Sequence, residues 1–75
     1  LLPELRVLSG RKVCTILARS GFNEVRRSSS HIVMQKRRGN STITAIVPDH
    51  GELKTGTLRS IIRQSQLPRR LFEVR

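Results

Sequence analysis

The chain has 75 residues, of which 36% are hydrophobic and 27% charged, a balance typical of one small folded domain over residues 1–75 rather than of a disordered tail. Fifteen Lys and Arg residues against five Asp and Glu give a formal net charge of +10, which favours an anionic partner such as nucleic acid or an acidic protein. No apolar run approaches the roughly 20 residues of a membrane span, and no signal-peptide pattern opens the chain, so we expect no contact with membranes.

The first helix is predicted over residues 10–20. Ser9 before it is a favourable N-cap residue. Leu8 and Val13 occupy the two positions of a hydrophobic staple across that cap. Gly21 is expected to end the helix, because glycine adopts a positive φ at little cost. Apolar residues at helical spacing form the face that we expect to be buried: Val13, Ile16 and Leu17.

Two residue types are scarce, and each scarcity excludes a class of site. Cys14 is the only cysteine, so the chain forms no internal disulfide and lacks the ligands of a zinc cluster. A reducing cytoplasm is the simple inference, and we expect Cys14 at the margin of the helix's buried face rather than as a nucleophile. Phe22 and Phe72 are the only aromatic residues, which argues against a platform on which single-stranded bases stack.

Three β-strands are predicted in the middle of the chain. Val25 is expected to be the apolar anchor of the first strand, and Pro48 to end the third, because proline has no N–H to donate to the ladder. Ile43, Ala45 and Val47 share one face of the third strand, because successive side chains point to opposite faces, and Thr42, Thr44 and Ile46 share the other. The strands are predicted over residues 22–27, 31–36 and 42–47, joined by a turn at 28–30 and a hairpin at Gly39-Asn40.

A second amphipathic helix follows a loop over residues 49–52, with Thr55 as its expected cap and Pro68 ending it. Its buried face comprises Leu58, Ile61 and Ile62. A final helical turn is expected to return Leu71 and Phe72 to the core. The predicted fold is therefore α+β, in the order α-β-β-β-α. A three-stranded antiparallel sheet would carry both helices on one face and leave the other face open.

One histidine stands inside a purely cationic stretch. Between Val25 and Pro48 there is no Asp or Glu, and His31 lies inside this segment, at the start of a predicted strand. Histidine can accept and donate a proton near neutral pH, and cations on both sides suit a polyanion. From these residues alone two readings stay open: a proton-transfer group beside RNA, or a strand-end histidine that only bonds a neighbour.

Several motifs in chain order resemble the HicA toxin family. Ser30-His31 followed by the apolar strand Ile32-Val33-Met34 is similar to the family's Gly-Ser-His strand, and Val47-Pro48-Asp49-His50 to its Val-Pro-x-His. The resemblance continues through residues 52–64, close to the family's Glu-Leu-x-x-Gly-Thr-Leu-x-x-Ile helix, and includes Val7-Leu8-Ser9-Gly10 at the start. Together these motifs cover nearly the whole chain, although each alone is weak.

The resemblance implies a double-stranded-RNA-binding-like fold and an mRNA interferase that a HicB-type antitoxin binds and blocks. It implies that His31 is the catalytic general acid or base, with mRNA as the substrate. His50 and Ser30 are secondary candidates, the former equally able to brace its loop. Candidates for RNA contacts are Arg26, Arg27, Lys36, Arg37 and Arg38, the last two equally readable as a solvated basic turn. No ligand cluster calls for a metal, and no small-molecule cofactor is expected.

Two positions depart from the family pattern. Ser29 stands where the family has glycine before Ser-His, and Gln66 where it often has a glycine that ends the helix. If the position before Ser-His needs a positive φ, Ser29 costs roughly 1 kcal/mol or shifts the turn. We expect Ser29 to reduce activity, and Gln66 to reduce stability rather than to affect the chemistry.

Two other functions compete with an RNA-cleaving toxin. A non-catalytic module that holds double-stranded RNA would use the same basic surface, and it would keep binding when His31 is replaced by alanine. A DNA-binding regulator of the helix-turn-helix type would need two adjacent helices, whereas here three strands separate the helices. The first alternative is the stronger of the two.

Overall fold

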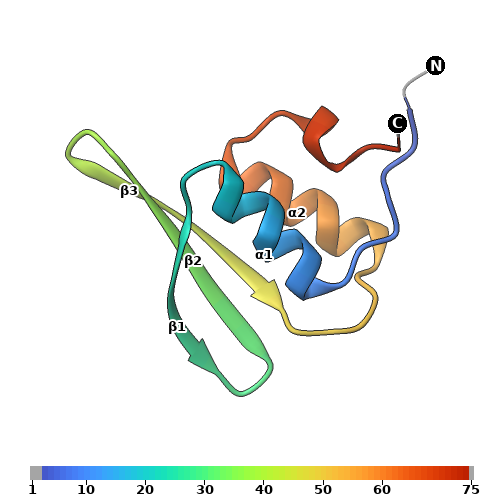
Figure 1. Cartoon of the computed structure of the whole chain (residues 1–75), viewed down its shortest axis with the longest axis horizontal. Helices are drawn as coiled ribbons and strands as arrows, with labels where there is room; N and C mark the ends of the chain where they lie inside the picture. The colour runs from blue at the N-terminus through green and yellow to red at the C-terminus, as the bar shows by residue number, and fades with distance from the viewer. Residues whose placement is uncertain (1–2, 75) are drawn as a thin grey trace.

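The computed structural model describes residues 3–74, so residues 1, 2 and 75 of the predicted domain lie outside the described residues. The strands form one antiparallel sheet in the order β1-β2-β3, and both helices pack against it (Figure 1). This arrangement confirms the predicted α-β-β-β-α fold. The elements are α1 (Gly10–Arg19), β1 (Asn23–Ser28), β2 (His31–Arg38), β3 (Ser41–Pro48), α2 (Thr55–Ser65) and the 3-10 helix η1 (Arg69–Phe72).

Helix α1 begins as its local sequence predicts. The Ser9 hydroxyl accepts a hydrogen bond of 3.1 Å from the Lys12 N–H. Leu8 and Val13, the two staple residues, are both buried. A Cβ at Gly10, the first helical residue, would overlap the carbonyl oxygen of Pro48, so only glycine lets α1 approach the end of β3 this closely.

The end of α1 is a Schellman motif. Gly21 has a φ of +96°, as predicted, and its N–H donates to the carbonyl of Ala18 at 3.1 Å. The Phe22 N–H donates to the carbonyl of Leu17 at 3.0 Å, the second bond of this motif. Phe22 thus bonds the end of α1 with its backbone and buries its side chain in the core, and β1 starts one residue later than predicted.

Strand β1 contains an irregularity that the sequence did not predict. The register with β2 shifts between Glu24 and Arg26, so Val25 is an extra residue in a β-bulge. Val25 is 53% exposed, and the prediction that it anchors the strand in the core is wrong. A bulge also reverses the alternation of side chains beyond it. Arg26 and Arg27 therefore face opposite sides of the sheet from those that an unbroken strand would give them.

Helix α2 starts and ends differently from the prediction. Thr55 is its first residue rather than its cap, and the N-cap residue Lys54 makes no side-chain hydrogen bond. At the other end Gln66 adopts the left-handed conformation, with a φ of 59°, in the place where the family often has glycine. The predicted final turn is present as η1, and it buries Phe72 completely.

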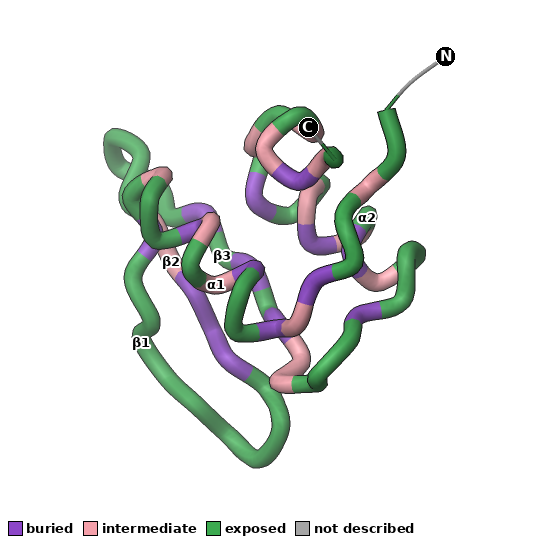
Figure 2. Tube along the Cα trace, turned by 45° about the vertical axis from the view of Figure 1, so that its right-hand side comes forward, coloured by how far each residue is buried: buried purple, intermediate pink, exposed green. Residues whose placement is uncertain are grey.

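The core lies between the helices and one face of the sheet. The sheet contributes Ile32 and Met34 from β2, and alternate residues of β3 that are buried as predicted: Ile43, Ala45 and Val47. In contrast, β1 and the turn into β2 are exposed along their whole length (Figure 2). Among the described residues, no helix covers the opposite face of the sheet (Figure 1). Within residues 3–74 no helix has the length and apolar character needed to span a bilayer.

Candidate functional site

The candidate site is the turn between β1 and β2 with the first residue of β2. Ser28 and His31 are paired across the turn, so Ser29 and Ser30 form a two-residue hairpin loop. Ser29 has a φ of 56°, whereas Ser30 is not in the positive-φ region. This pattern matches a type II′ turn, whose first central residue is normally glycine. The turn thus brings His31 to the end of the sheet with its side chain exposed.

The register places His31 on the open face of the sheet. Its neighbour Ile32 pairs with Val47, and both side chains lie in the core. Because successive side chains of a strand point to opposite faces, His31 faces away from the helices. His31 pairs with Ser28 on one side and Pro48 on the other, so strands hold its backbone from both sides.

Arg26 shares this open face with His31. Arg26 pairs with Val33, two residues along from the Ser28–His31 pair. Such diagonal neighbours on one face are about 7–8 Å apart, within the reach of an arginine side chain. No ion pair involves Arg26 among the described residues.

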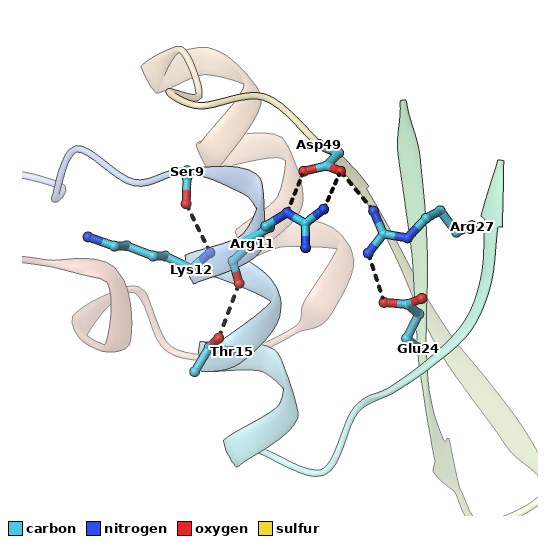
Figure 3. Close-up of polar contacts among 7 residues, drawn as sticks. All are labelled: Ser9, Arg11, Lys12, Thr15, Glu24, Arg27 and Asp49. Atoms are coloured by element: carbon cyan, nitrogen blue, oxygen red, sulfur yellow. Dashed lines mark hydrogen bonds and ion pairs between the residues drawn. The ribbon is translucent and has the colours of Figure 1, made fainter. Parts of the chain in front are cut away.

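Arg27 lies on the helix face and is held in ion pairs. Its guanidinium donates to Asp49 at 2.8 Å and to Glu24 at 3.3 Å (Figure 3). Asp49 also forms an ion pair with Arg11 of α1, with 3.3 Å between Nε and Oδ1. Glu24 and Asp49 are the two acids that bracket the acid-free stretch, and both of them neutralise Arg27.

Asp49 joins three parts of the site. Its backbone N–H donates to the carbonyl of Ser30 at 2.6 Å, next to His31 in the chain. Its carboxylate bridges α1 and β1 through Arg11 and Arg27 (Figure 3). Sequence reasoning missed this role of Asp49 and Arg11. The only signal was a lone acid directly after Pro48, in a stretch otherwise rich in cations.

The two secondary candidates lie at the same end of the sheet. Ser30 is exposed in the turn, where its carbonyl accepts the bond from Asp49. His50 is exposed in the loop after β3, and its carbonyl accepts the N–H of Gly10 at 2.9 Å. Both residues therefore have structural roles through their backbones, while their side chains are accessible.

The remaining cationic candidates lie at the other end of the β2–β3 hairpin. Lys36 is on the helix face, where its side chain passes beside Gly21. Arg37 is exposed on the open face, and six strand residues place it about 20 Å from His31. Arg38 donates to the Gln66 side chain at 2.6 Å. The fold thus gathers Arg26, Ser30 and His31, but not this second cluster.

Cys14 lies on the α1 side of the sheet and is partly buried. Burial, together with the nearby carboxylate of Glu24, raises the pKa of the Cys14 thiol above its usual value. The protonated thiol is a poor nucleophile, which agrees with the expected structural role. Within residues 3–74, no three His, Cys, Asp or Glu side chains lie close enough together to hold a metal ion.

Comparison with known proteins adds one finding to this geometry. A family model described as the HicA toxin of bacterial toxin-antitoxin systems matches residues 10–67. The match runs from the first residue of α1 to just past Gln66 and includes the whole sheet. A search of curated proteins found no match.

Proposed function

The chain belongs to the HicA toxin family, and we propose that it is an mRNA endoribonuclease in which His31 transfers the protons. The family makes it the toxin of a toxin–antitoxin system. The observation that carries the proposal is the exposed His31 on the open face of the sheet, with Arg26 beside it and no acidic residue among the strand residues of that face. We place its action in the cytoplasm, where mRNA is translated.

RNA supplies its own nucleophile for this reaction. The ribose 2′-oxygen attacks the adjacent phosphorus, which forms a 2′,3′-cyclic phosphate and breaks the bond to the 5′-oxygen. The 2′-hydroxyl loses a proton to a base, and the departing 5′-oxygen gains one from an acid. A histidine in either role typically contributes 10²–10⁴-fold to the rate. No metal ion is needed for any of these steps.

His31 can serve as this acid or base because its imidazole is exposed and its backbone is held by two strands. Arg26, the nearest cation on that face, would offset the charge that builds up on the phosphate oxygens. Ser30 would orient the phosphate from the turn. His50, at the same end of the sheet, is the candidate for the second proton transfer.

The partner that we propose for the free toxin is a HicB-type antitoxin. A chain with a net charge of +10 favours an acidic protein partner. An antitoxin that covers the exposed end of the sheet would block access to His31. Coexpression with the neighbouring open reading frame should therefore give a stable complex with no cleavage activity.

The test is cleavage of a defined RNA by the purified protein in EDTA. We expect fragments that end in a 2′,3′-cyclic phosphate and begin with a 5′-hydroxyl, and no cleavage where the attacking 2′-hydroxyl is replaced by hydrogen. His50→Ala should slow the reaction if His50 is the second proton-transfer group. Binding without any cleavage by the parent would instead support the non-catalytic double-stranded-RNA module.

A further inference from the structure

We propose that the open face of the sheet is the surface on which the RNA strand lies, with Arg26 and Arg37 as its phosphate contacts. The proposal rests on the proposed function, because it takes His31 as the point of cleavage. It assigns neighbouring cations to different roles: Arg26 and Arg37 bind RNA, whereas Arg27, which is paired with two carboxylates, and Lys36, which lies on the helix face, do not.

The register defines the members of this face. Ile32 and Met34 point into the core, so the alternate residues of β2 point outward, and their partners in β1 and β3 point outward with them. The Gln35 amide donates to the Thr44 hydroxyl at 3.2 Å, which places this pair on one side. The open face comprises Asn23, Arg26, Ser28, His31, Val33, Gln35, Arg37, Thr42, Thr44, Ile46 and Pro48.

The charge of this face complements a polyanion. It carries two arginines and a histidine, and none of its eleven residues is acidic. On the helix face the situation is reversed, because Arg27 is paired with Glu24 and Asp49. A phosphate that approached Arg27 would have to displace two carboxylates, whereas one that approached Arg26 would meet none.

The bulge at Val25 creates this division between adjacent arginines. Glu24 pairs with Met34 on the helix face, so an unbroken strand would turn Val25 outward and Arg26 inward. The extra residue shifts the alternation by one, and Arg26 comes to the face that carries His31. The bulge therefore selects which arginine stands beside the histidine.

The dimensions and chemistry of the face suit a single strand. Six residue steps along β2 take the chain from His31 to Arg37, a distance of about 20 Å, so an extended strand can contact both ends of the face with several phosphates between them. Ile46, which is 47% exposed, lies between the two ends and offers an apolar contact to a base, whereas its cross-strand partner Val33 is buried. A single strand can also rotate its 2′-oxygen into line with the scissile bond, whereas the regular A-form duplex restricts that movement.

The experiment measures RNA binding in a His31→Ala background, in which the RNA stays intact. A labelled 12-nucleotide RNA is titrated between 50 and 200 mM KCl, alone and as a duplex with its complement. The variants Arg26→Gln, Arg37→Gln, Arg27→Gln and Lys36→Gln each remove one charge, so the four are matched. Circular dichroism and thermal unfolding verify that each variant is folded.

We expect Arg26→Gln and Arg37→Gln each to reduce the slope of log K against log salt by about 0.7, the value for one phosphate contact with a single strand. Fourfold more salt then weakens the parent about 2.6-fold more than either variant. Arg27→Gln and Lys36→Gln should leave the slope unchanged, and the single strand should bind more tightly than the duplex.

Equal loss of slope in all four variants would overturn the proposal, because binding would then follow net charge and not the face of the sheet. Tighter binding of the duplex would also overturn it. Unchanged slopes in Arg26→Gln and Arg37→Gln would assign the face to a protein partner instead. Cleavage by the parent is measured separately, so the predicted slopes without any cleavage would reject the proposed nuclease and retain the docking surface.

Discussion

Replacing Ser29 with glycine should stabilise the protein. The two hairpins of the sheet offer an internal comparison, because each has a two-residue loop whose first residue has a positive φ. In the β2–β3 loop that residue is Gly39, with a φ of 61°, whereas in the β1–β2 loop it is Ser29, with a φ of 56°. Only the second loop places a side chain in this conformation.

The magnitude follows from the backbone. An L-residue in the left-handed region costs roughly 1–2 kcal/mol. Glycine removes that cost but adds about 0.5–1 kcal/mol of conformational entropy to the unfolded chain. The difference should raise the free energy of unfolding by about 0.5–1 kcal/mol. For a domain of this size, Tm changes by about 4–8 °C per kcal/mol.

Urea denaturation monitored by circular dichroism measures the effect as a shift of the midpoint at constant m-value. Ser30→Gly is the matched control, because Ser30 is in the same loop but outside the positive-φ region. This control should lose about 0.5–1 kcal/mol through unfolded-state entropy alone. If Ser29→Gly were as unstable as Ser30→Gly, the assignment of strain to Ser29 would be refuted.

Three further predictions test other parts of the fold. Gly10→Ala should destabilise the protein by about 1–3 kcal/mol, because the new Cβ would overlap the Pro48 carbonyl. Gly56→Ala in α2, where the added Cβ has open space around it, should stabilise the protein by about 0.5–1 kcal/mol. Urea denaturation midpoints distinguish the two variants, and equal shifts would contradict the close approach of α1 to the end of β3. Gln66→Gly should raise the free energy of unfolding by about 0.5 kcal/mol in the same assay. A lower free energy of unfolding would mean that the hydrogen bond from Arg38 to the Gln66 side chain outweighs the backbone strain. Cys14 should react with iodoacetamide more slowly in the native protein than in urea at pH 8, because its raised pKa keeps the thiol protonated; equal rates would show that the thiol is accessible and ionised.

Local signals in the sequence were sufficient for most of the fold. Ser9 and Gly21 predict the two ends of α1 through their own backbone preferences, and the structure places the helix between them. Alternation in β3 predicts its buried face because a side chain's direction depends only on its parity in the strand. Ser29 and Gln66, the two positions where the sequence differs from the family's glycines, are the only non-glycine residues with a positive φ among residues 3–74.

The composition of the candidate site depended on features that single positions do not encode. The bulge at Val25 is a feature of the pairing between β1 and β2, and no local preference of valine predicts it. Without the bulge, Arg26 and Arg27 look equivalent. The bridge through Asp49 joins residues 22 and 38 positions apart, so only the packed structure reveals it. Thr55 is a favourable cap by type, but the chain enters α2 one residue earlier.

The central claim is that His31 transfers protons during RNA cleavage, and its most direct test compares the parent with His31→Ala. Single-turnover cleavage of one RNA is measured in EDTA at saturating protein, after both proteins are shown to bind the RNA. The account predicts that His31→Ala binds the RNA but cleaves it at least about 10²-fold more slowly. Equal cleavage rates for the two proteins would contradict it.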